Sequence, residues 1–296
     1  MIVSDASLHS LTEYSYTTTG NAVAQVGTFT FPADPAGGAI SPQEVVFDAN
    51  GNMWTTSAGG TVKEWCTASA GCTNPSGGAT IGVGQVMQTV TVPTPDGLPR
   101  GIVVDSHTAT TTIYVTTSSY GALTDNVYDF TLTGAGLANP LAGYSGLVGN
   151  TVSTQETGQL RGITYDKAGN VYYADSTWAA SGTNTGYVNE NTGTTAVVSG
   201  LAGPNELLTG NGTIGSGSVS SSCDVLYVAN YYGGTIQEIS TGITSGGFQF
   251  NNDGCGDTSG GNQHVDSTSG TYLTLASTNI SGIALAFGDG GVAGGG

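Results

Sequence analysis

Four charged residues occupy two adjacent positions of a repeated sequence pattern, and they are the residues best placed to do chemistry. Arg100 and Arg161, the only arginines, each stand just before a short aliphatic segment. Glu44 and Glu206 stand one residue later in two other copies of the pattern, where the arginine-containing copies have glycine. If each aliphatic segment is an innermost strand, two cations and two anions converge on one mouth of a central channel.

Such a cluster has two interpretations. Oppositely charged groups can form a salt-bridged plug that fixes the order of the repeats and offsets the burial of charge. Alternatively, planar guanidinium forks can grip the carboxylate of a small sugar acid, which predicts an anionic or carbohydrate ligand. The uncharged polar residues Gln43 and Asn205 take the place of the arginines in other copies and join these channel-mouth binding candidates.

Oxygen-bearing side chains also suggest a hard cation such as Ca²⁺, although the preferred expectation is no cofactor. One set of weak metal candidates is Asp48, Asn50 and Asn52 in a glycine-containing turn. This set has the alternate spacing of a calcium loop but lacks a distal bidentate glutamate. A hairpin turn is therefore its preferred interpretation.

The elements that would position these residues recur five times. A tetrad recurs in which the first residue is apolar, the second variable, the third acidic and the fourth usually apolar. The tetrads follow one another at spacings of 48 to 65 residues and lie at 11–14, 62–65, 127–130, 188–191 and 236–239. Two further apolar segments accompany most tetrads, and a fourth outer strand is expected at 85–92, 195–198 and 272–275. Four-stranded antiparallel units at such a period are the blades of a β-propeller.

The sequence therefore predicts an all-β chain with a single propeller domain over residues 1–296. Five blades are expected, at about 40–92, 98–155, 159–198, 203–275, and 278–296 joined with 1–31. A sixth, degenerate blade within 242–270 is the alternative. Because residues 1–5 align with a second strand and 283–286 with a first strand, both chain ends would share one blade and close the ring, removing open sheet edges.

Charge and hydropathy exclude two kinds of partner. Lysine and arginine total 4 against 21 acidic residues, a net charge of −17, so the chain lacks the cations needed to bind nucleic acid. No apolar run approaches the roughly 20 residues that span a bilayer, so no membrane span is expected. Hydrophobic residues still make up 38% of the chain, which favours a folded protein.

The cysteines suggest an extracellular protein. An even number of cysteines in a nearly lysine-free chain favours two disulfides. Of three possible pairings, those that close the shortest loops join Cys66 to Cys72 and Cys223 to Cys255, and four free buried thiols are the alternative. Residues 1–20 show no basic start before an apolar core, so a secretory signal is taken as already removed. Asn211 and Asn279 match the N-glycosylation pattern of a secreted glycoprotein.

Residues 41–54 and 160–175 resemble NHL repeats, and the tetrads resemble those of streptogramin-lyase-like propellers. The resemblance covers nearly the whole chain, with gaps at 66–84, 131–157 and 240–270, and it implies the propeller fold. These families include lyases, lactone hydrolases and binding scaffolds, so the resemblance selects no function. Metal-dependent lactone hydrolases with propeller folds place Glu, Asn and Asp around a central ion, and this resemblance implies a second set of weak metal candidates at the repeat starts: Glu44, Asn205 and Glu206. The lyases use a histidine near a carboxylate on inner strands. Here His9, His107 and His264 do not match that position, so no catalytic residue is assigned.

The preferred hypothesis is a secreted, non-enzymatic propeller that acts as an extracellular structural scaffold and self-associates into filaments or arrays. Sparse charge and spare strand material at the chain ends support it. The enzyme alternative is a metal-dependent lyase or lactone hydrolase that acts on a small sugar acid near Glu44 or Glu206. A third hypothesis is a carbohydrate- or protein-binding module that uses Trp178, Tyr231 and Tyr232.

Overall fold

The computed structural model describes the strands of the chain and part of the turns between them. The described residues are 2–5, 9–17, 22–31, 42–48, 50–57, 59–74, 78–92, 98–105, 111–118, 125–132, 144–147, 158–165, 171–177, 186–190, 198–210, 224–231, 235–244, 247–249 and 273–274. Within these ranges the regular elements are all β-strands, and no helix is long and apolar enough to cross a membrane.

Five antiparallel sheets contain these strands, and we name four of them blades I to IV. The N-terminal sheet contains β1 (Ile2–Asp5), β2 (Ser10–Thr17) and β3 (Ala22–Thr30). Blade I contains β4 (Pro42–Phe47), β5 (Met53–Ser57), β6 (Thr61–Trp65) and β7 (Val86–Thr91). Blade II contains β8 (Leu98–Asp105), β9 (Thr111–Ser118), β10 (Val127–Leu132) and β11 (Tyr144–Leu147).

Blades III and IV continue the same order of strands. Blade III contains β12 (Gly158–Tyr165), β13 (Val171–Thr177), β14 (Gly186–Glu190) and β15 (Val198–Leu201). Blade IV contains β16 (Pro204–Gly210), β17 (Asp224–Asn230), β18 (Thr235–Thr244), β19 (Gly247–Gln249) and β20 (Leu273–Thr274). In blade IV the two short strands β19 and β20 pair with opposite ends of β18.

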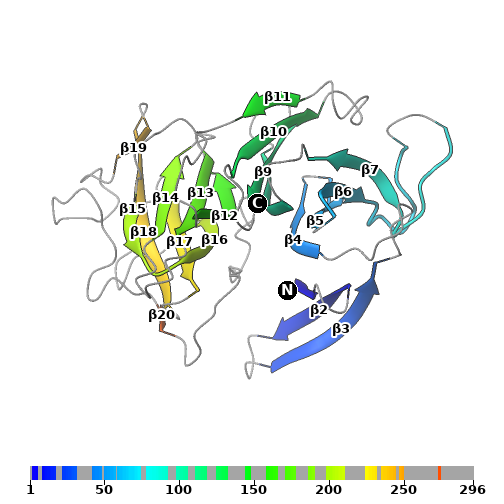
Figure 1. Ribbon diagram of the computed structural model, residues 1–296. Helices are drawn as coiled ribbons and strands as arrows, with labels where there is room; N and C mark the ends of the chain where they lie inside the picture. The colour runs from blue at the N-terminus through cyan, green and yellow to red at the C-terminus, as the bar shows by residue number, and fades with distance from the viewer. Residues whose placement is uncertain are drawn as a thin grey trace.

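The blades are arranged around the first strands of their sheets, as in a β-propeller (Figure 1). Strand β12 packs against β8 on one side and β16 on the other, and β8 packs against β4. The predicted all-β propeller of four-stranded antiparallel units is therefore confirmed. The number of blades stays a prediction, because most of 242–270 and the expected closing strand at 283–286 lie outside the described residues.

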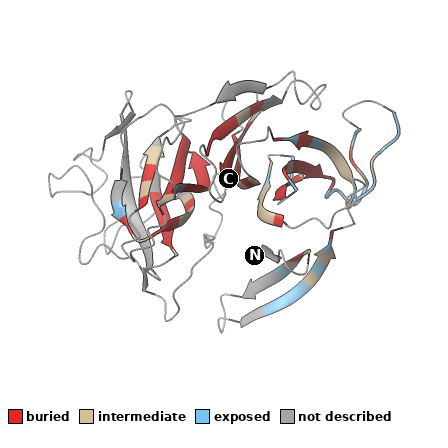
Figure 2. Ribbon diagram, viewed as in Figure 1, coloured by how far each residue is buried: buried red, intermediate tan, exposed pale blue. Residues whose placement is uncertain are grey.

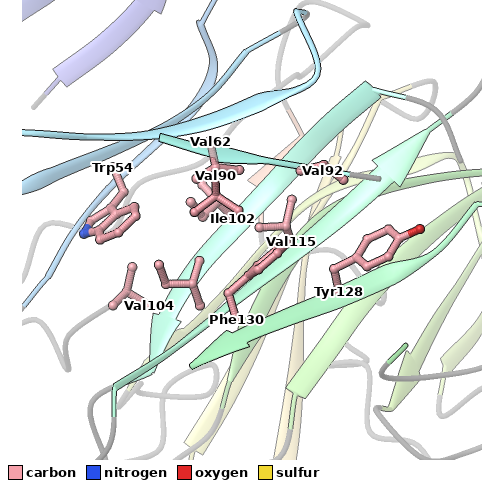
Figure 3. Close-up of a cluster of buried hydrophobic side chains, with 10 residues drawn as sticks. Trp54, Val62, Val90, Val92, Ile102, Val104, Val115, Tyr128 and Phe130 are labelled. Atoms are coloured by element: carbon pink, nitrogen blue, oxygen red, sulfur yellow. The ribbon is translucent and has the colours of Figure 1, made fainter. Parts of the chain in front are cut away.

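Apolar side chains fill the space between successive blades, and the described residues of the second strands, β5, β9, β13 and β17, are mostly buried (Figure 2). Alternate residues of a strand point to opposite faces, so one strand serves two interfaces. On β9, Ile113 and Val115 face blade I, whereas Tyr114 joins the cluster shared with blade III. Trp54 is fully buried between blades I and II, opposite Ile102 and Val104 (Figure 3).

The turn between β4 and β5 is a hairpin, as preferred. The Asp48 carboxylate accepts the backbone N–H groups of Asn50 and Asn52, each at 2.9 Å, and the Trp54 indole N–H at 3.2 Å. Gly51 supplies the positive φ, +79°, that this tight turn needs. Both Asp48 oxygens thus bond to groups of the protein itself, which accounts for the turn without a bound ion.

The outer strands were the least predictable elements. Strands β3 and β11 were not predicted as strands, and the fourth strand of blade III begins at Val198, where the predicted segment ended. An outermost strand packs on one neighbour only, so its apolar alternation is weak. The disulfide between Cys66 and Cys72 is confirmed. Several predicted residues lie outside the described residues: Cys223, Cys255, Asn211, Asn279, His107, His264, Trp178 and Tyr232.

Candidate functional site

The charged residues singled out in the sequence lie in β-bulges of the four inner strands. In blade I the pairing runs from Pro42 with Ser57 to Val45 with Thr55, which leaves two residues opposite Thr56. Strands β8, β12 and β16 each carry one extra residue at the corresponding place. A bulge redirects side chains out of the ladder. The bulged residues are Gln43 and Glu44, Arg100 and Gly101, Arg161 and Gly162, and Asn205, which is followed by Glu206.

A threonine on the second strand accommodates the bulge of blade I and ties it to blade II. The Thr56 hydroxyl accepts the backbone N–H of Glu44 at 3.1 Å and donates to the carbonyl oxygen of Arg100 at 2.7 Å. An amide displaced by the bulge and a carbonyl of the next blade are thereby both satisfied. This role was not predicted from the sequence, although threonine recurs at the corresponding position of β9, Thr116, and this recurrence indicated a shared role.

The same connection recurs one blade further on, where glycine is required. The Thr116 hydroxyl accepts the Gly101 N–H at 2.8 Å and donates to the carbonyl of Arg161. A Cβ on Gly101 would lie 2.3 Å from that carbonyl oxygen, and one on Gly162 would lie 2.6 Å from the Cα of Glu206. Close approach of the neighbouring strand therefore explains why glycine occupies the position that is glutamate in blades I and IV.

Glu44 and Glu206 meet, although their strands belong to blades I and IV. Their carboxyl groups hydrogen-bond to each other. Glu44 also accepts the Ile102 N–H at 3.1 Å, and Glu206 accepts the Leu207 N–H at 3.2 Å. Burial raises the pKa of both carboxyls, and the charge of Glu206 raises the pKa of Glu44 further. The pair therefore holds its protons to a higher pH than free glutamates do, and both residues retain some exposed surface.

The arginines bond to amides. An Arg100 guanidinium N–H donates to Gln43 Oε1 on blade I, and an Arg161 N–H donates to Gln159 Oε1 on its own strand. Neither arginine is among the groups that shift the pKa of Glu44 or Glu206. The expected convergence thus places carboxyl against carboxyl and guanidinium against amide.

A further carboxyl of altered acidity lies in blade I. Burial and the charge of Asp48 raise the pKa of Glu64 to about 7, against the opposing effect of hydrogen bonds from Gln88 and Asn52. The bond from Asn52 Nδ2 to Glu64 Oε1 is 2.9 Å long and links the β4–β5 turn to β6. Glu64 is 4% exposed, so its carboxyl lies in the interior of the blade.

The two metal candidate sets differ in their surroundings. Glu44 and Glu206 lie together, and Asn205 is the bulged residue directly before Glu206, whereas the Asp48 carboxylate is occupied by the turn. Within the part of the chain that the structure describes, no group of three or more histidine, cysteine, aspartate or glutamate side chains is placed to hold a metal ion. The carboxyl pair can donate and accept a proton, which is the chemistry that its geometry supports directly.

No protein-family model matches the chain, and no curated protein matches it. Among solved structures it is similar to a protein from Lactobacillus plantarum, with 10% identity, a TM-score of 0.47 and coverage of 84% of this chain and 65% of that one. It is also similar to the periplasmic gluconolactonase PpgL of Pseudomonas aeruginosa, with 15% identity, a TM-score of 0.45 and coverage of 83% of this chain and 64% of that one. The Dos1 propeller has 7% identity and a TM-score of 0.42, with coverage of 80% of this chain and 63% of that one. The chain thus spans less than two thirds of each, and such low similarity transfers neither site nor function.

Proposed function

We propose that this protein is a secreted, non-enzymatic β-propeller that serves as an extracellular structural scaffold and self-associates through its outer strands. The observation that carries the proposal is the outermost strand of the N-terminal sheet, β3, which has no charged side chain. Exposed residues of β3 include Gln25, Val26, Thr28 and Thr30, and Val26 is 60% exposed.

An outer strand of this kind favours pairing with another chain. Edge strands of soluble proteins are commonly protected by lysine, proline or an inward-pointing charge, because bare strand edges template association. Strand β7, the outermost strand of blade I, is also uncharged. With charged residues at 8% of the chain, repulsion between copies is sparse over these edges, so strand addition from one copy to the next is favoured.

The test is negative-stain electron microscopy together with light scattering of the native protein at neutral pH. Regular filaments, arrays or discrete oligomers are expected, and the double variant Val26→Lys/Thr28→Lys should reduce them to single propellers. Asn50→Lys is the matched control, since it adds a positive charge at an exposed turn far along the chain from β3. Isolated propellers in the native sample would overturn the proposal.

A second candidate function rests on the Glu44–Glu206 pair. Two adjacent carboxyl groups whose pKa values are raised by burial are an arrangement that general acid–base catalysis uses. The enzyme would be the lyase or lactone hydrolase considered for the sequence, with Arg100 and Arg161 binding the carboxylate of a small sugar acid. Turnover of aldonolactones and uronic acids, followed by NMR, tests it. Activity lost in Glu44→Gln and in Glu206→Gln, with folding unchanged, supports an enzyme, and a native protein inert towards both classes contradicts it.

A further inference from the structure

The interface between blades II and III changes character at the end where the inner strands begin. Its apolar cluster includes Val127 of β10, Leu160 of β12 and Tyr173 of β13. Two residues from Val127 stands Asp125, and two residues from Tyr173 stands Asp175, so strand alternation places both aspartates on the faces that meet at this interface. The interface therefore ends in two carboxyl groups.

Hydrogen bonding and register confirm that the two aspartates are neighbours. Asp125 Oδ2 accepts the backbone N–H of Leu160 at 3.2 Å. Leu160 is the direct cross-strand partner of Asp175, and such partners have Cβ atoms about 4.5–5.5 Å apart. A residue of blade II is thus bonded to the backbone beside the carboxyl of blade III.

Both carboxyl groups are buried, and one of their oxygens has no partner among the described groups. Asp125 and Asp175 are each 5% exposed, and Asp175 Oδ1 accepts no hydrogen bond there. Ser118 of β9 is 1% exposed, and its hydroxyl oxygen also has no hydrogen-bond partner among the described groups. Its side chain faces blade III, because the hydroxyl of Thr116, two residues earlier, bonds to Arg161 of that blade. The aspartates and Ser118 therefore direct oxygen atoms into one buried region.

Two neighbouring buried carboxylates are unfavourable unless a positive charge or a proton compensates them. The corresponding positions elsewhere avoid the problem. Glycine replaces Asp125 in blades I and III, at Gly60 and Gly186, and a hydroxyl residue replaces Asp175 in blades I and II, at Ser57 and Thr117. Of the interfaces that the structure describes between blades I to IV, that of blades II and III combines the two carboxyls.

We propose that Asp125, Asp175 and Ser118 bind a hard divalent cation, Ca²⁺ in preference to Mg²⁺, which joins blade II to blade III. All three offer oxygen ligands, and two carboxylates balance a divalent charge. Carboxylates bind Ca²⁺ through one or both oxygens in flexible geometry, whereas Mg²⁺ demands a regular octahedron and usually retains several waters. A site lined by residues at 5% exposure or less leaves little room for such waters.

The experiment uses the full chain, first dialysed against EDTA and then returned to metal-free buffer. Isothermal titration with CaCl₂ should show one ion bound per chain at this site, and 1 mM Ca²⁺ should raise the Tm by at least about 3 °C. MgCl₂ at the same concentration should give a smaller shift. Asp175→Asn and Asp125→Asn, which keep the side-chain shape, should abolish the binding and the Ca²⁺-dependent shift. Ser118→Ala should weaken binding several-fold.

The central carboxyl pair supplies the matched control. Glu206→Gln should bind Ca²⁺ as the native chain does. Loss of binding in Glu206→Gln with retention in Asp175→Asn would place the ion at the centre and overturn the proposal. A native chain that takes up no Ca²⁺ and shows no Tm shift would also overturn it. If an aspartate variant fails to fold, the titrations of the native chain, Ser118→Ala and Glu206→Gln decide the question.

Discussion

Two pairs of carboxyl groups lie inside this propeller, and they differ in what compensates them. Glu44 and Glu206 bond to each other, accept one backbone N–H each and keep some exposed surface. Asp125 and Asp175 lie deeper, and Asp175 Oδ1 has no hydrogen-bond partner within the described part of the chain. A proton suffices for the first pair, whereas the second pair has the oxygens for a cation.

The difference shows which polar groups the fold requires. The Thr56 and Thr116 hydroxyls satisfy groups that the bulges displace, so they follow from the architecture itself. A carboxyl pair between two blades does not follow from it, because glycine and threonine, Gly60 and Thr117, occupy the same positions at the interface of blades I and II. Features that the architecture does not demand are the ones to test for function.

The largest effect is expected from closing the space beside the central pair. In Gly162→Ala the new Cβ would lie 2.6 Å from the Cα and 2.8 Å from Oε1 of Glu206, and backbone atoms cannot move aside cheaply. We expect the free energy of unfolding to fall by about 3 kcal/mol, measured by urea denaturation. The control Gly27→Ala meets no atom within 4 Å and should change stability by less than about 1 kcal/mol. Equal effects would show that the close approach is not rigid.

Neutralising each pair should separate them by their response to metal. With Ca²⁺ at about 100 times its Kd, the native chain gains about 2.7 kcal/mol over its EDTA-treated form, and Asp125→Asn/Asp175→Asn should lose this gain completely. Glu44→Gln/Glu206→Gln should keep it. Thermal unfolding of the three proteins with and without Ca²⁺ makes the measurement. A Ca²⁺ response that both double variants retain would place the ion elsewhere.

The central pair should instead respond to pH. An unfolded glutamate loses its proton near pH 4.5, whereas in the folded chain the pair holds a proton to higher pH, so the folded state binds more protons in between. Stability is therefore full at low pH and falls as the pH rises from about 5 to 8. Glu206→Gln should flatten this slope by about 1–2 kcal/mol over that range, measured by urea denaturation at several pH values.

Glu64 contributes to the same pH range and has to be separated from the pair. Its pKa of about 7 is also raised, so its contribution to stability is likewise lost as the pH rises from about 4.5 to 7. Glu64→Gln should remove that part of the slope and leave the part above pH 7. A slope that neither variant changes would mean that other groups carry the pH dependence.

The sequence predicted the inner part of the propeller well because apolar alternation and hairpin turns are local signals. Four of the five tetrads lie wholly in strands, and the fifth lies in β14 as far as Glu190, the last described residue there. The two adjacent positions that hold Arg100, Arg161, Glu44 and Glu206 mark the four bulges. The bulges themselves were not predictable, since one extra residue leaves no trace in a short alternating pattern. The contact between Glu44 and Glu206 was not predictable in detail either, because the two residues lie 162 positions apart in the sequence, on blades I and IV.

The Asp125–Asp175 pair escaped the sequence analysis for a different reason. The two aspartates stand in different repeats, and the corresponding residues of blade I are Gly60 and Ser57. Their proximity arises from packing of one blade on the next, which no spacing within a repeat reports. Thr56 and Thr116 offered a better signal, since threonine recurs at the same place in two repeats.

The smallest effect is expected from those threonines, and it tests whether they belong to the architecture. Thr116→Val keeps the shape of the side chain but leaves the Gly101 N–H and the Arg161 carbonyl without this partner. We expect a loss of about 1–2 kcal/mol in the free energy of unfolding, with the Ca²⁺ response of the II–III interface and the pH slope unchanged. Thr112→Val, at a partly exposed position of the same strand, should cost less. If Thr116→Val also altered the response to Ca²⁺, the bulge and the aspartate pair would form one coupled site, because Ser118 lies only two residues beyond Thr116.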